Sequence, residues 1–174
     1  MAKRKTSKPA SPPPEIAIIG DLSEDGEKEI VDAILDIEPG SEATMYIDSG
    51  GGSVYSALAI VTLMRIRKLK ATAIVIGECS SSTLLVFAAC QRRLVTERSV
   101  FLFHRVKWRS DKDYGSAEAV NWASHFQWLE SEADRYQAEL FGAEEEPFSS
   151  WVNEGRFVLG PELAEMGLAE LIDA

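Results

Sequence analysis

Three consecutive serines, Ser80, Ser81 and Ser82, lie where the apolar pattern of the chain changes its period. The β-branched run at 71–76 predicts a buried strand that Gly77 ends, and the apolar run after the serines has helical character. We therefore expect the serines on a strand-to-helix turn, where the free N–H groups of the first helical turn favour developing negative charge. Such a turn suits a nucleophilic hydroxyl. The other interpretation is a serine that only caps a buried helix.

A second candidate is the glycine-rich segment 49–53, with the sequence Ser-Gly-Gly-Gly-Ser. It follows a predicted strand at 43–48 and precedes an amphipathic helical pattern that begins at Val54. Consecutive glycines allow unusual φ values and close approach of the backbone to another group. Such a turn can also bind phosphate, but neither G-x-G-x-x-G nor G-x-x-x-x-G-K-[ST] is present. The segment is therefore interpreted as a structural turn or as a set of N–H donors for an oxyanion.

A histidine, His104, comes directly after a predicted short strand at 100–103. A single histidine at a strand end is commonly a structural residue. This one lies one αβ unit beyond Ser81, so the chain could bring it back to face the serine turn.

The elements that would position these residues alternate between strand and helix, which is typical of an α/β fold. A first strand is predicted at 15–20, Ser23 can cap the helix after it, and a further short strand is predicted at 94–96. Near the C-terminus we expect a short helix around 148–152 and an extended piece at 156–159.

Residues 116–141 carry one long helical pattern, whose polar face carries Glu118, Gln127, Glu130, Glu132, Asp134 and Arg135. About 26 residues at 1.5 Å each extend roughly 39 Å, which is long for a domain of this size. Its large apolar residues could pack on the core or contact another subunit. His125 lies within this pattern, and no catalytic role is assigned to it.

Composition predicts a cytoplasmic protein with one globular domain at 15–174, preceded by a disordered or extended basic, Pro-rich tail at 1–14. The net charge of −10 argues against nucleic acid as a partner, and no apolar run is long enough to cross a membrane. The basic start has no apolar segment after it, so a secretory signal is not expected. Cys79 and Cys90 lie in apolar surroundings, which favours a reducing compartment, and neither has metal-ligand spacing.

Four segments together carry a resemblance to a known family. They are Ile47-Asp48-Ser49-Gly50-Gly51-Gly52-Ser53-Val54, Gly77 through Ala89, Phe101-Leu102-Phe103-His104, and Arg156-Phe157 followed by Gly160 through Leu168. In this order and spacing they resemble the Clp protease proteolytic subunit family, which shares its fold with the crotonases. The resemblance covers 15–174 and implies a spiral of ββα units with a long protruding handle helix at 116–141.

The resemblance also implies roles for individual residues. Ser81 matches the nucleophile, with Ser80 and Ser82 as neighbours in the wrong register, and His104 matches the general base. The backbone N–H groups of Gly52 and Ser82 match the oxyanion hole. Such a serine endopeptidase hydrolyses peptide bonds in peptides or unfolded proteins and needs no metal or cofactor.

The sequence departs from the family at the position of the third catalytic group. Gly155 stands where the family has its catalytic aspartate. Asn153 is the preferred substitute, because it would share a side with position 155 if the chain is extended there. Glu154, Asp111 and Asp113 are alternatives, as is a Ser–His dyad or a catalytically silent protein.

Further departures concern the groove and the partners. Gly50 replaces a proline, Arg105 replaces a glutamine after the histidine, and Ser82-Thr83 replaces a Met-Gly pair. The family partner implied here is an AAA+ unfoldase of the Clp type, although the N-terminal axial-loop segment of the family is not recognisable.

Three hypotheses follow from these features. The leading one is a Clp-like serine peptidase that forms a ring-shaped homo-oligomer through its long helix. The second is a silent paralogue that assembles with or regulates active subunits, and Gly155 favours it. The third is a crotonase-like enzyme acting on acyl-CoA, which has no need for Ser81 and His104 in peptidase register.

Overall fold

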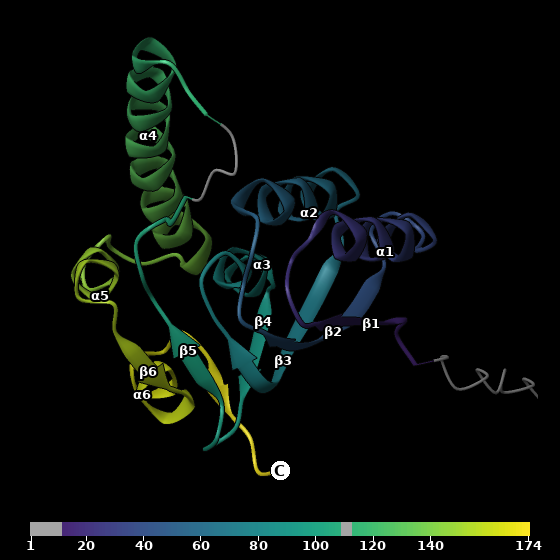
Figure 1. Cartoon of the computed structure of the whole chain (residues 1–174). Helices are drawn as coiled ribbons and strands as arrows, with labels where there is room; N and C mark the ends of the chain where they lie inside the picture. Colours follow the sequence, from purple (N-terminus) through teal and green to yellow (C-terminus); the bar gives the residue numbers. More distant parts are fainter. Residues whose placement is uncertain (1–11, 109–112) are drawn as a thin grey trace, which may run out of the picture.

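The computed structural model describes residues 12–108 and 113–174, and it has the predicted α/β architecture (Figure 1). The predicted tail at 1–14 therefore lies almost entirely outside the described residues, as does Asp111. In chain order the elements are β1 (Glu15–Ile19), α1 (Glu24–Leu35), β2 (Glu42–Ser49), α2 (Val54–Ile66), β3 (Lys70–Cys79), α3 (Thr83–Ala89), β4 (Arg92–Val95), β5 (Val100–Leu102), α4 (Ser116–Phe141), α5 (Phe148–Glu154), β6 (Phe157–Leu159), α6 (Gly160–Glu165) and β7 (Glu170–Leu171).

A parallel sheet with the strand order β1-β2-β3-β4-β7 forms the centre of the fold. Alternate side chains of β1 and β2 are buried, and helices α1, α2 and α3 lie side by side next to the sheet (Figure 1). β5 leaves this path: it pairs with the end of β3 through Glu78 and Val100, and it pairs antiparallel with β6. This branch carries the chain toward His104.

Helix α4 has the bounds predicted from its periodicity, Ser116–Phe141. Figure 1 shows it extending well past the remaining elements. Its buried residues are confined to the C-terminal half and begin at Leu129, whereas Val120 and Trp128 are 65% and 57% exposed. The helix ends at Gly142, whose φ of 68° gives the left-handed conformation that commonly terminates helices. The N-terminal half of α4 thus has no buried residue, although Tyr55 contacts its His125 and Trp108 stacks on its Trp122.

The prediction that Gly77 ends the third strand is wrong, because β3 continues to Cys79. Gly77 is required for a close approach instead: a Cβ there would lie 2.4 Å from Oδ1 of Asp48. That carboxylate oxygen accepts a hydrogen bond of 3.0 Å from the N–H of Glu78. The three serines consequently follow the end of β3 directly, with no residue between Cys79 and Ser80.

The choice of Asn153 assumed that the chain is extended at 153–155, and this assumption is wrong. Residues Phe148–Glu154 form α5, and Gly155 ends this helix with a φ of 67°. Tryptophan and phenylalanine side chains on α5 pack into the core, and this packing outweighs the local sequence signal.

Both cysteines are buried free thiols, as the apolar pattern predicted. Burial raises the pKa of Cys79 well above its ordinary value and that of Cys90 to about 12. Among the described helices, none combines the length and the apolar character that a membrane span requires.

Candidate active site

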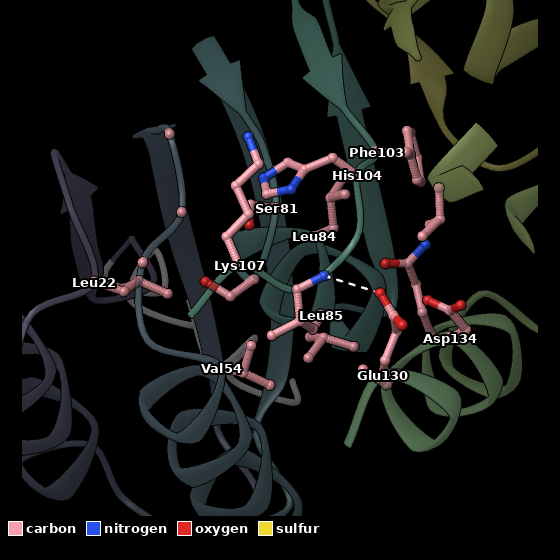
Figure 2. Close-up of a pocket in the computed structure, with 18 of the residues that line it drawn as sticks. Leu22, Val54, Ser81, Leu84, Leu85, Phe103, His104, Lys107, Glu130 and Asp134 are labelled. Carbon is pink, nitrogen blue, oxygen red and sulfur yellow. Dashed lines mark hydrogen bonds between the residues drawn. The ribbon is translucent and has the colours of Figure 1, made fainter. Parts of the chain in front are cut away.

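A cavity of about 720 Å³ opens where four segments meet: the glycine-rich loop, the serine turn, the segment after β5, and α4 (Figure 2). Ser81, His104, Gly52 and Ser82, four of the five residues singled out from the sequence, all line it. The fifth, Asn153, does not.

The serine turn is held to two neighbouring segments by main-chain hydrogen bonds. The N–H of Ser80 donates to the carbonyl of Ser49 at 3.0 Å, and the N–H of Ser81 donates to the carbonyl of Leu102 at 2.9 Å. The buried hydroxyl of Ser80 accepts a hydrogen bond of 3.0 Å from the N–H of Leu102. Ser80 therefore has a structural role, and the peptide groups of one residue of β5 fix the turn.

Ser81 is the serine of the three that is not fully buried. Its φ of 56° lies in the left-handed region, which is uncommon for a residue with a side chain and is typical of strained functional turns. Ser82 occupies the N-cap position of α3, but its hydroxyl makes no capping hydrogen bond. Simple helix capping by a serine side chain is therefore not what this turn provides.

The glycine-rich loop presses against the serine turn. A Cβ on Gly51, whose φ is 99°, would lie 2.5 Å from Cβ of Ser81 and 2.7 Å from the carbonyl oxygen of Ser80. The loop is anchored on the other side by Leu22, whose N–H donates to Gly51 O at 2.7 Å and whose carbonyl accepts from Ser53 N at 2.9 Å. These contacts explain why the segment needs glycine.

Two N–H groups beside Ser81 are not used by the fold. Within the described chain, the backbone N–H groups of Gly52 and Ser82 donate no hydrogen bond. Both residues line the cavity. Unpaired amide donors next to a hydroxyl are able to stabilise an oxyanion that develops on a bound carbonyl.

His104 is directed toward the cavity by the residue before it. Phe103 is fully buried, its ring lies 5.0 Å from that of Trp151 between centroids, and its N–H donates to the carbonyl of Arg156 at 3.0 Å. Figure 2 shows His104, Ser81 and Lys107 in the same region of the view, and all three residues line the cavity.

The imidazole of His104 has a defined orientation. Its Nδ1 lies 2.6 Å from the carbonyl oxygen of Arg105, which only a protonated Nδ1 can use as a hydrogen bond. The lone pair is then on Nε2, the arrangement that a general base needs. In the described chain, no hydrogen bond joins the side chains of His104 and Ser81.

The proposed substitutes for the third group lie elsewhere. Asn153 Oδ1 accepts a hydrogen bond from Nη2 of Arg105, and Glu154 accepts one of 3.2 Å from the hydroxyl of Ser150. Asp113 is exposed and does not line the cavity. Asp111 is outside the described residues.

Arg105 takes part in the site in a way that the sequence did not predict. From the sequence it was only a departure from the family pattern. Its carbonyl holds His104, its Nη1 donates to Oε2 of Glu130 at 3.1 Å, and its Nη2 donates to Asn153. It thus connects the imidazole to α4 and α5. Spacing alone gives no signal for such a link, because the three partners lie far apart in the chain.

The wall of the cavity contributed by α4 is polar and was also missed. Glu130, Asp134 and Gln137 line it, at a spacing that places them on one helical face. Burial raises the pKa of Asp134 to about 6, the neighbouring Glu130 carboxylate adds to the rise, and Arg105 opposes it. The i, i+4, i+7 spacing is the sequence signal that could have found this face. No group of three or more His, Cys, Asp or Glu residues that could hold a metal ion occurs in the described ranges.

Comparison with known proteins gives two matches. The sequence model of the Clp protease family matches residues 14–172, which include every element from β1 to β7. The chain is also 25% identical over 164 residues to the ATP-dependent Clp protease proteolytic subunit of Pleurastrum terricola, across 91% of this chain and 83% of that protein.

Proposed function

Because this chain belongs to the Clp protease family, a family of serine peptidases, we propose that it hydrolyses peptide bonds with Ser81 as nucleophile and His104 as general base. The observation that carries the proposal is that both side chains and two unpaired N–H groups line one cavity although they come from separate segments.

The chemical steps follow from these groups. Nε2 of His104 takes the proton of the Ser81 hydroxyl as its oxygen attacks the scissile carbonyl carbon. The N–H groups of Gly52 and Ser82 hold the oxyanion of the tetrahedral intermediate. The imidazolium then protonates the leaving amine, and a water molecule hydrolyses the resulting ester by the same steps in reverse. The Ser81–His104 hydrogen bond forms when substrate binds, as catalytic contacts often tighten only in the complex.

We assign the task of the missing aspartate to the carbonyl of Arg105. A carbonyl oxygen fixes the imidazole tautomer but carries no full charge with which to stabilise the imidazolium, so turnover should be slower than with a carboxylate. Asn153 then acts as a positioning residue, because it holds the Arg105 side chain.

Substitution of Asn153 tests this positioning role. Asn153→Ala is expected to lower kcat on the order of 3- to 10-fold with little change in KM, because Arg105 loses one anchor while substrate contacts remain. Asn153→Asp keeps an acceptor for the guanidinium and should restore kcat to within about 2-fold of the unaltered enzyme. Arg98→Ala, which removes an exposed guanidinium elsewhere, is the matched control. Equal kcat in Asn153→Ala and the control would show that Asn153 has no positioning role.

A fluorophosphonate probe with intact-mass readout tests the proposed function itself. We expect one adduct per chain on the folded protein, fragmentation that maps it to Ser81, and no adduct after denaturation, because only the folded site activates the hydroxyl. A fluorogenic peptide then measures turnover. Absence of both adduct and turnover would favour the second candidate, a silent paralogue, which Gly155 at the aspartate position supports.

We also propose that the chain forms a homo-oligomer, ring-shaped as in the family, through α4. The exposed Val120 and Trp128 on the protruding half of this helix support an interface there, because large apolar side chains exposed together commonly mark protein contacts. An AAA+ unfoldase of the Clp type is a further proposed partner, since the matched relative is named an ATP-dependent subunit.

Charges placed on this surface should disrupt assembly. Val120→Asp combined with Trp128→Glu is expected to shift the particle to a smaller mass in analytical ultracentrifugation, because the interface would have to bury two unpaired carboxylates. Ile66→Glu on α2, where the side chain is 71% exposed, is the matched control and should leave the mass unchanged. An unchanged mass in the double variant would exclude this half of α4 as the interface.

A further inference from the structure

We propose that the cavity beside Ser81 binds a lysine or arginine side chain of the substrate, on the residue that supplies the scissile carbonyl, with the Asp134 carboxylate as its counter-ion. The direction of the peptide rests on the proposed function, whereas binding of a cation in the cavity does not.

The composition of the cavity wall favours a long side chain with a cationic end. Leu84, Leu85 and Val152 provide apolar lining, and α4 contributes Glu130, Asp134 and Gln137. Figure 2 shows Glu130 and Asp134 together on the α4 side of the cavity. Lysine and arginine match such a wall, because their methylene stems pack on apolar surface while the charged end makes polar contacts.

The two carboxylates differ in their partners. Both oxygens of Glu130 are occupied, Oε2 by Arg105 Nη1 at 3.1 Å and Oε1 by the N–H of Val106 at 3.2 Å. Asp134 is half-buried and, within the described ranges, makes no hydrogen bond and no ion pair. A partly buried anion without a partner is unfavourable, and an entering cation would remove that penalty.

A second observation is independent of the acidic residues. Gln137 is 6% exposed and Ser82 is 5% exposed, and the Nε2 atom of the first and the hydroxyl of the second have no hydrogen-bond partner in the described chain. Both residues line the cavity. Buried polar groups are nearly always satisfied, so two unsatisfied groups here indicate a polar ligand. A carboxamide can present either its nitrogen or its oxygen after a half turn, and the Ser82 oxygen is also able to accept from a cation.

Matched peptides that differ at one residue test the preference. A peptide with lysine before the scissile bond is expected to have a kcat/KM roughly 10- to 100-fold above that of its norleucine analogue, the uncharged chain of similar length. Asp134→Asn should bring this ratio close to one. Glu132→Gln removes a carboxylate from the same helix that is bonded to Arg135 and does not line the cavity, so the ratio should stay unchanged.

The ratio of the two rates should also depend on pH. Asp134, with its pKa near 6, becomes charged as the pH rises from 5 to 7, so the lysine preference should increase over this interval. The groups near Asp134 are Glu130 and Glu145, which raise its pKa, and Arg105, which lowers it; Lys107 also lines the cavity. Any effect of pH on the chemical step itself is common to both substrates and cancels in the ratio. A lysine-to-norleucine ratio near one at every pH in the unaltered enzyme would overturn the inference while leaving the proposed function standing.

A binding measurement separates the inference from catalysis. Benzamidine, a small aromatic cation, should show saturation-transfer NMR signals with the Ser81→Ala protein, its neutral analogue benzamide should show much weaker ones, and Asp134→Asn should abolish the difference. Such binding together with no turnover of any peptide would refute the proposed function and support the cation site. Equal signals for benzamidine and benzamide would overturn the cation site whatever the turnover.

Discussion

Replacement of Ser81 by alanine is expected to lower kcat/KM for a fluorogenic peptide by on the order of 10⁴-fold or more, because the attacking oxygen is removed. Folding should be preserved: the main-chain hydrogen bond from Ser81 to Leu102 does not involve the side chain. The strained φ of 56° tolerates alanine about as well as serine. Initial rates and circular dichroism on the same preparation measure both quantities.

A serine-to-alanine change away from the cavity serves as the control. Ser41→Ala changes a serine directly before β2, far from the glycine-rich loop that follows this strand, and should leave the rate unchanged. Residual activity of Ser81→Ala within 10-fold of the unaltered enzyme would mean that another group performs the chemistry, and a crotonase-like reaction on acyl-CoA would then have to be measured in the same variant.

Replacement of Gly51 by alanine is expected to lower the free energy of unfolding by about 3 kcal/mol or more and to remove activity. Two terms add up. A side chain at a φ of 99° is strained, and its Cβ would lie 2.5 Å from Cβ of Ser81 and 2.7 Å from the Ser80 carbonyl, which no rotamer change can relieve. The loop or the serine turn must therefore move, and the nucleophile moves with it.

Gly40→Ala is the matched variant, because its φ of 81° is comparable but no heavy atom lies within 4 Å of the added Cβ. It should cost only about 1 kcal/mol and retain activity. Denaturant titration at one fixed protein concentration compares the two, since assembly would otherwise shift the transition. Equal stability of the two variants would contradict the close contact between the glycine-rich loop and the serine turn.

Several elements were predictable from the sequence for clear physical reasons. The bounds of α4 follow from a sustained helical period before a glycine that adopts the left-handed conformation. The helix after the glycine-rich loop begins where Ser53 caps it, with the Ser53 hydroxyl accepting from the N–H of Ser56 at 3.2 Å. Such signals are local, so they are present in the sequence itself.

The errors and omissions depend on contacts between distant segments. Gly77 looks like a strand end because glycine commonly breaks strands, yet its place is set by the Asp48 carboxylate on the neighbouring strand. Asn153 is helical because α5 packs into the core. Glu130 and Asp134 look like ordinary solvated residues until α3 and the segment after β5 close a cavity against them. Periodicity identifies a face of a helix but does not identify what meets it.

The two peptide groups of Leu102 have a mechanical consequence. Its carbonyl and its N–H both bind the serine turn, and His104 follows two residues later, just beyond the end of β5. The Ser81 hydroxyl and the His104 imidazole are therefore both positioned by β5 and do not move independently of each other. Strand β5 pairs with β3 through a single residue pair, whereas it pairs with β6 along its whole length. The alignment of Ser81 and His104 thus depends on the pairing of β6 with β5. Loss of this pairing can abolish activity while the central sheet stays folded.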